Sequence, residues 1–93
     1  MQFYLYILRL QSGGLYIGCT KNIRKRYQDH FNGRGCRTTK SDPPVEPIYH
    51  ERFDSFSAAR KREAQIKRWS RAKKEALVAG DLEKLKLLSK SKH

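Results

Sequence analysis

The sequence predicts an α+β domain in which helices cover a small three-stranded sheet of antiparallel type. Two runs of aromatic and branched residues near the N-terminus are joined by a short Gly-containing link. An apolar period of four residues follows them, and a third strand-like run then precedes further helical segments. The 93 residues are enough for one such domain with a single core.

The N-terminal hairpin is the clearest local prediction. Residues 3–10 (FYLYILRL) contain no Pro or Gly and are expected to form a buried strand. Residues 11–14 (QSGG) are expected to form a turn, and residues 15–19 (LYIGC) a second strand. Because the link is short, the strands are antiparallel, and Tyr6 and Tyr16 are expected to be cross-strand neighbours on one face.

A helix is expected after the hairpin. Thr20 or Asn22 can cap its start. Within it Ile23, Tyr27 and Phe31 recur every four residues, which predicts one apolar stripe.

The remaining segments complete the order β-β-α-β-α-α. Residues 33–44 (GRGCRTTKSDPP) are expected to form a basic functional loop. Residues 45–54 resemble a third strand, with Pro47 near its beginning or on a sheet edge. Residues 56–69 and 70–79 are expected to form helices. A short C-terminal helix and a basic tail are expected over residues 81–93.

Charge is the strongest signal in the composition. The chain has 21 Lys and Arg against 9 Asp and Glu, a net charge of +12, and its pI is near 10.1. A pI above about 9 is typical of nucleic-acid-binding domains. We therefore expect a nucleic acid as the partner, rather than an anionic membrane or a surface that is merely solvated.

Several classes of protein do not fit the sequence. No apolar run approaches the roughly 20 residues that span a bilayer, and the N-terminus lacks the pattern of a secretory signal. We therefore expect a cytoplasmic monomer. Cys19 and Cys36 have no CxxC spacing or matching His cluster, so reduced thiols are expected rather than zinc ligands or a disulfide.

Polar side chains are expected to gather on one side of the sheet. Arg26 and His30 are four residues apart on one helix and share a face. With Tyr6 and Tyr16 they would form a polar cluster, and the alternative is two core tyrosines beneath solvated helix charges. Glu63 is a lone acid in a basic helix, where it either pairs with its neighbours or binds Mg²⁺.

These residues resemble the motifs of the GIY-YIG nuclease superfamily. Residues 4–6 (YLY) and 16–18 (YIG) are similar to the two motifs that give the family its name. Arg26 follows the second motif's tyrosine by ten residues, and His30 comes four residues later. Glu63 then falls where the family has its metal-binding glutamate. The chain most resembles the small stand-alone bacterial members, with residues 1–80 as the nuclease-like domain.

The resemblance implies an endonuclease that depends on a divalent metal and cleaves phosphodiester bonds in DNA, in repair or recombination. Tyr6 would position or deprotonate the attacking water, and Tyr16 would support it near the phosphate. Arg26 would stabilise the charge that develops on the phosphate, and His30 would lie close to the catalytic tyrosine. Glu63 would bind one Mg²⁺ or Mn²⁺ ion.

Tyr6 and His30 are the two candidate bases. A tyrosine with an ordinary pKa of about 10 is ionised in only about one molecule in a thousand at pH 7, although a nearby arginine or metal lowers that pKa. The ordinary pKa of histidine, about 6.5, already suits neutral pH. We expect Tyr6 to act with the assistance of His30.

Basic elements outside this cluster are expected to contact phosphates, which positions a nucleic acid without reading its sequence. Each of these basic residues could instead be an ordinary solvated surface residue that contacts no nucleic acid. The alternative to an endonuclease is a non-catalytic module that binds DNA or RNA on the same fold. In either case a protein partner could supply substrate specificity. The expected phosphate contacts are Arg34, Arg37, Lys40, Lys67, Arg68, Arg71, Lys73 and Lys74.

Overall fold

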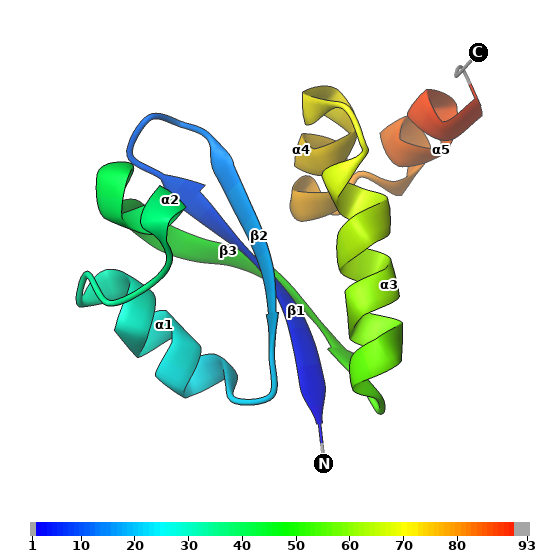
Figure 1. The fold of residues 1–93 in the computed structure, drawn as a ribbon. Coiled ribbons are helices and arrows are strands. Elements are labelled where there is room, and N and C mark those ends of the chain that lie inside the picture. The colour runs from blue at the N-terminus through cyan, green and yellow to red at the C-terminus, as the bar shows by residue number, and fades with distance from the viewer. Residues whose placement is uncertain (1, 91–93) are drawn as a thin grey trace.

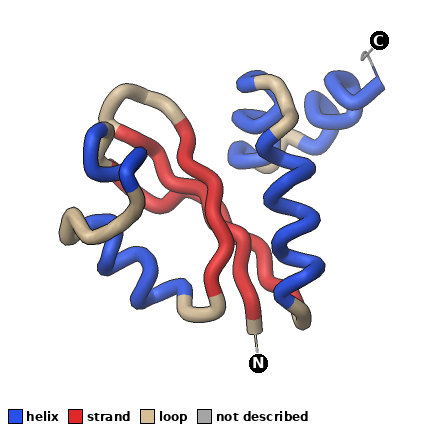
Figure 2. The backbone as a smooth tube through the Cα atoms, viewed as in Figure 1, coloured by secondary structure: helices blue, strands red, loops and turns tan. Residues whose placement is uncertain are grey.

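The computed structural model describes residues 2–90 and confirms the predicted α+β fold (Figure 1). Its sheet is antiparallel, with the spatial order β2-β1-β3. The strands are β1 (Phe3–Leu10), β2 (Leu15–Thr20) and β3 (Pro44–Phe53). Figure 2 shows the strands between two groups of helices. One group comprises α1 (Ile23–Phe31) and α2 (Arg37–Ser41). The other comprises α3 (Phe56–Lys67), α4 (Arg71–Ala79) and α5 (Leu82–Lys90).

The central strand β1 is buried on both faces. Tyr6 and Leu8 are buried on the face opposite the main apolar cluster. A strand covered on both faces needs apolar residues in succession rather than in alternation, which explains the unbroken run in this segment. The main apolar cluster joins the hairpin to α3 and α4 and consists of Leu5, Ile7, Ile17, Ile66 and Leu77.

The register of the hairpin places its two motif tyrosines diagonally. Tyr6 lies opposite Gly18, and Leu8 lies opposite Tyr16. The two tyrosines therefore point to the same face, as predicted, but they are not direct cross-strand partners. Their ring centroids are 6.2 Å apart. The direct partner of Tyr6 is a glycine, which leaves room for the tyrosine ring over the neighbouring strand.

Polar caps set the helix ends. Asn22, rather than Thr20, caps α1 by accepting a hydrogen bond from a backbone amide of the first turn. Ser55 caps α3 and Ser70 caps α4 in the same way. Each cap satisfies an amide that has no partner within the helix. Gly80 ends α4 with a φ of 73°, a left-handed conformation that glycine adopts at little cost.

The segment 33–44 is not simply the irregular loop that the sequence predicted. It contains the short helix α2, in which Thr39 is only 2% exposed. The Thr39 hydroxyl lies 3.0 Å from Nδ1 of His30 and donates to the carbonyl of Cys36 at 3.2 Å. The short helix α2 therefore comes with a tertiary contact between Thr39 and His30, which local sequence patterns cannot predict.

The face that α1 turns toward the sheet also differs from the predicted apolar stripe. His30 is 1% exposed, whereas Phe31 is 42% exposed. Arg26 and Tyr27 are half-buried beside His30. A buried histidine is tolerated when its polar atoms have hydrogen-bond partners, and both ring nitrogens of His30 have one.

An ion-pair network attaches α4 to the hairpin turn. Arg9 forms two parallel bonds to the Glu75 carboxylate, at 2.7 and 2.9 Å, and Arg71 adds another at 2.8 Å. Both arginines also donate to the carbonyl of Gly13. Hydrogen bonds from Arg9 and then Arg71 lower the pKa of Glu75 to about 2.

The C-terminal helix predicted after Gly80 is α5. Asp81 caps it through a bond from the amide of Lys84, and Leu85 packs against the main apolar cluster. The tail at 91–93 lies outside the described residues. No helix within residues 2–90 is both long enough and apolar enough to cross a membrane.

Candidate active site

A cavity of about 240 Å³ lies beside the edge strand β2. Its walls come from both strands of the hairpin and from α1 and α3, so it collects side chains from both sides of the sheet. Four of the five residues that resemble family motifs line it, and His30 contacts one of them. The lining residues are Tyr6, Tyr16, Gly18, Cys19, Arg26, Phe56, Arg60 and Glu63.

Tyr6 is the residue around which the polar side chains gather. Its hydroxyl oxygen shares a hydrogen bond of 2.9 Å with Nε2 of His30 and accepts one of 3.2 Å from Nε of Arg26. The rings of Tyr16, Tyr27 and His30 surround the Tyr6 ring, with centroids 5.6 to 6.2 Å away. The predicted polar cluster therefore exists as a bonded network.

Burial controls the protonation of both motif tyrosines. It raises the pKa of Tyr6, and the hydrogen bond and charge of Arg26 offset only part of that effect. Burial also raises the pKa of Tyr16, followed by the effect of its hydrogen bond with Cys36. Arg26 therefore lowers the pKa of Tyr6 as expected, but burial outweighs it and the net shift is upward. Both phenols are protonated at neutral pH.

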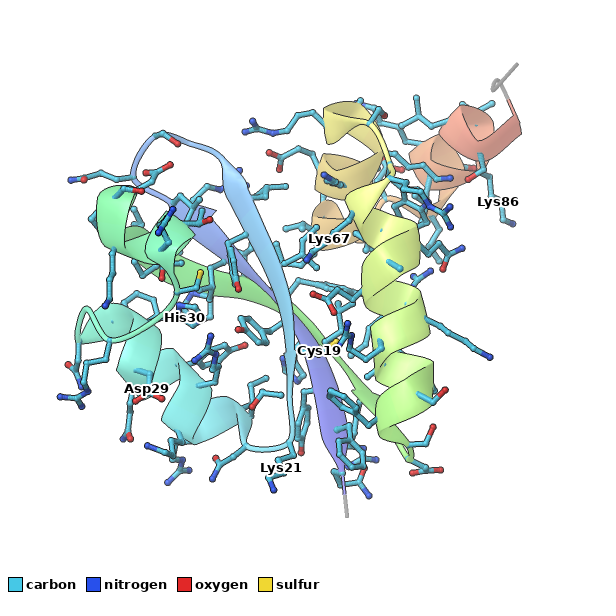
Figure 3. The ribbon with its side chains drawn as sticks, in the orientation of Figure 1. Cys19, Lys21, Asp29, His30, Lys67 and Lys86 are labelled. Atoms are coloured by element: carbon cyan, nitrogen blue, oxygen red, sulfur yellow. The ribbon has the colours of Figure 1, made fainter. Side chains whose placement is uncertain are left out.

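His30 is a neutral imidazole hydrogen-bonded to Tyr6. Burial, and then the positive charge of Arg26, lower the pKa of His30 below its ordinary value of 6.5. The imidazole is therefore uncharged at physiological pH. Figure 3 shows His30 close to where α1 and α2 approach the sheet.

Glu63 provides the carboxylate of the cavity from α3. It forms ion pairs with Arg60 at 3.4 Å and with Lys67 at 2.9 Å, and its side chain is 14% exposed. In Figure 3 Lys67 extends from α3 toward the sheet, and Cys19 lies between the sheet and the same helix. Burial, and then the Glu63 carboxylate, raise the pKa of Cys19 to about 12, so this thiol remains protonated.

Five of the eight expected phosphate contacts form neither an ion pair nor a cation–π contact with another residue in the described part of the chain. Three of them lie on the α1–α2 loop and on α2, and the others lie at the end of α3 and on α4. They are fully or partly exposed. These five are Arg34, Arg37, Lys40, Arg68 and Lys74.

The other three expected phosphate contacts are engaged within the fold. Lys67 pairs with Glu63, and Arg71 belongs to the network that attaches α4 to the hairpin turn. Lys73 lies 4.2 Å from the ring centroid of Trp69, which packs against the main apolar cluster. These interactions give each cation a structural role beside any contact with a nucleic acid.

Sequence reasoning missed three residues at the site. Phe56 and Arg60 line the cavity, and the Arg60 guanidinium lies 5.6 Å from the Phe56 ring centroid. They precede Glu63 by seven and three residues, so helical spacing could have placed them on its face. Thr39 had no such signal, because its contact with His30 depends on the path of the intervening loop.

Comparison with known proteins identifies the family. A family model described as the GIY-YIG catalytic domain matches residues 2–76. The chain belongs to the GIY-YIG family. This GIY-YIG assignment confirms the resemblance that the motif residues suggested, and it places the chain in a family of nucleases.

Relatives of similar length share the GIY-YIG region. A UPF0213 protein of Natronomonas pharaonis is 47% identical over 78 residues, which cover 84% of this chain and 92% of the relative. One from Staphylococcus saprophyticus is 46% identical over 76 residues, covering 82% and 93%. The NMR structure of a UPF0213 protein from Bacillus halodurans is 34% identical, with a TM-score of 0.56 over 85% of this chain and 84% of that chain.

The substitution Gly18→Ala tests the close packing of Tyr6 on β2. An added Cβ would lie 2.5 Å from the Tyr6 hydroxyl oxygen, which is already bonded to Arg26 and His30 and cannot move freely. We expect the free energy of unfolding, measured by urea denaturation, to fall by about 1–3 kcal/mol.

Gly14→Ala is the matched control for this substitution in the same hairpin. Its added Cβ would meet the Ser12 hydroxyl at 3.2 Å, and moving that hydroxyl would disturb only exposed hydrogen bonds, to Asp42 and to the amide of Gly14. Equal destabilisation by the two variants would show that Tyr6 does not set the requirement for Gly18.

Proposed function

We propose that this chain is an endonuclease that depends on a divalent metal and cleaves phosphodiester bonds in DNA. The observation that supports this most is the meeting of Tyr6, Arg26 and Glu63 around one cavity. Tyr6 would accept a proton from water, Arg26 would bind a phosphate, and Glu63 would bind a metal ion. The net charge of +12 favours an anionic polymer as the substrate.

Arg26 would bind the scissile phosphate. Its guanidinium is charged at any physiological pH, and its planar array of donors suits phosphate oxygens. Nε is used by Tyr6, and the terminal nitrogens have further N–H donors for a ligand. Catalysis of phosphoryl transfer is mostly positioning and charge stabilisation. Arg26 would hold the phosphate next to Tyr6, to which it is bonded, and would stabilise the charge that develops on the phosphate.

Tyr6 and His30 would act together as the base. A water molecule donates a proton to the Tyr6 oxygen while Tyr6 passes its own proton to Nε2 of His30. The water oxygen then bonds to phosphorus, the bond to the leaving oxygen breaks, and that oxygen takes a proton from solvent. Tyr6 remains a neutral phenol after the transfer, so its raised pKa does not prevent this path. Tyr16 would support Tyr6 from the same face of the hairpin.

Glu63 would bind the metal ion. The Lys67 ammonium lies 2.9 Å from this carboxylate, a contact that marks a position already suited to a cation. Mg²⁺ commonly uses one or two protein carboxylates and retains several waters, so the residues fit Mg²⁺ or Mn²⁺. Across residues 2–90 no group of three or more His, Cys, Asp and Glu side chains is placed to share an ion. When bound, the ion would stabilise charge on the leaving oxygen.

A cleavage assay tests the proposed function. Single-stranded, duplex, flap and branched DNA are incubated with the protein and Mg²⁺ or Mn²⁺. We expect Tyr6→Phe to lower the cleavage rate by about 10²–10⁴-fold, because it removes the proton-transferring oxygen. Glu63→Gln is expected to abolish metal-dependent cleavage.

Two control variants for the assay carry the same chemical change outside the cavity. Tyr4→Phe removes a hydroxyl from the same strand, and Glu83→Gln removes a carboxylate from α5, away from the cavity lining. Both variants are expected to cleave at the wild-type rate. Salt-sensitive binding without cleavage of any substrate would instead support the non-catalytic module.

A second set of substitutions tests the phosphate contacts. We expect Arg34→Gln, Arg37→Gln and Lys40→Gln each to weaken DNA binding and to reduce the salt slope by about one. None of the three should change the urea midpoint, because these side chains form no ion pair within residues 2–90.

The contrasting variant is Arg71→Gln. It should lower the urea midpoint, because Arg71 bonds to Glu75 and to the carbonyl of Gly13. A wild-type salt slope in all three exposed variants would remove the α1–α2 region from the binding surface.

A further inference from the structure

Thr39 is buried against the side of His30 that faces away from Tyr6. Among residues 2–90, His30 and Thr39 are the buried polar residues other than Tyr6. They are in contact with each other. The distance from Thr39 Oγ1 to His30 Nδ1 is 3.0 Å. Thr39 thus ends a chain of contacts that runs from Arg26 through Tyr6 and His30 to α2.

One arrangement of protons gives every hydrogen in this chain an acceptor. Thr39 has a single hydroxyl proton, and the carbonyl of Cys36, at 3.2 Å, can only accept it. The Thr39 oxygen then accepts from His30, which places the imidazole proton on Nδ1. Nε2 of the neutral ring carries a lone pair and accepts from the Tyr6 hydroxyl at 2.9 Å.

The reverse arrangement takes the Tyr6 proton out of its hydrogen bond with His30. If Thr39 donated to Nδ1, the imidazole proton would be on Nε2 and would point at the Tyr6 oxygen. That oxygen already accepts from Arg26, and the Tyr6 proton would have to turn away from His30, toward Tyr16 or the cavity. The first arrangement gives each of these buried donors an acceptor inside the fold and keeps the bond from Thr39 to the Cys36 carbonyl, so it is favoured.

Gly35 packs directly over the contact between His30 and Thr39. A Cβ at this position would overlap Nδ1 of His30 and would lie 2.5 Å from Thr39 Oγ1. Gly35 is not among the described glycines with positive φ, so the requirement is for space rather than for an unusual backbone. The close passage of the chain keeps solvent from this hydrogen bond, which strengthens it.

We propose that Thr39 is a positioning residue that fixes His30 in the tautomer protonated on Nδ1. The role in cleavage rests on the proposed function, since it concerns the acceptor for the proton of Tyr6. With the proton on Nδ1, Nε2 is free to accept. With the proton on Nε2, His30 cannot accept from Tyr6, and the proton path ends at Tyr6.

The tautomer is measured first, by long-range proton–nitrogen NMR correlation of the imidazole rings. A His30→Gln variant assigns the signals. In the wild-type protein and in Thr39→Ser we expect a proton on Nδ1 and an unprotonated Nε2. Thr39→Val has a similar shape but no hydroxyl, and it should show the other tautomer or a mixture. Thr38→Val removes an exposed hydroxyl from the same helix and should match the wild type.

Cleavage is measured second, with the same variants. We expect Thr39→Val to lower kcat at least about tenfold with KM unchanged, and Thr39→Ser and Thr38→Val to retain activity. A wild-type rate in Thr39→Val would overturn the role in cleavage. A wild-type protein that cleaves no nucleic acid would contradict the proposed function, while the NMR result would still decide the tautomer.

The NMR measurement can contradict the proposed tautomer of His30 in two ways. A proton on Nε2 in the wild-type protein would overturn the proposal, as would an unchanged Nδ1 tautomer in Thr39→Val. If Thr39→Val fails to fold, as judged by its amide spectrum, the wild-type and Thr39→Ser tautomers decide the question.

Discussion

The candidate site depends on one interaction, the burial of the Tyr6 hydroxyl between Arg26 and His30. A buried hydroxyl without partners would cost about 1–3 kcal/mol. Satisfying it requires α1 to turn His30 inward, and Phe31 is left exposed as a result. His30 in turn needs a partner for its second nitrogen, which Thr39 supplies from α2. The Tyr6 hydroxyl thus explains both which face of α1 is directed at the sheet and why α2 packs against His30.

The same burial determines the charges at the site. It raises the pKa of Tyr6 and lowers that of His30, so both groups are neutral at physiological pH. A neutral phenol beside a neutral imidazole can transfer a proton along an existing hydrogen bond. The fixed charges that line the cavity are Arg26, Arg60 and Glu63. The arrangement thus combines a phosphate-binding cation, a carboxylate and an uncharged proton path.

The sequence predicted the strands, the main helices and the cluster of Tyr6 and Arg26, because periodicity and motif spacing are local signals. It did not predict the helix at 37–41 or the complete burial of His30, because both depend on contacts between distant segments. The net rise in the pKa of Tyr6 was not predicted either. The charge of Arg26 was visible in the sequence, but the degree of burial was not.

The most direct test of this account is the pKa of Tyr6 in the folded protein. NMR of tyrosine labelled with ¹³C at Cζ would follow the phenol from about pH 6 to about pH 11, with a variant lacking Tyr6 for assignment. The account predicts that Tyr6 remains protonated through its ordinary pKa of 10.0 and titrates above it. Ionisation of Tyr6 near neutral pH would contradict the account, since the phenol would then be a resident charge rather than a buried, hydrogen-bonded neutral group.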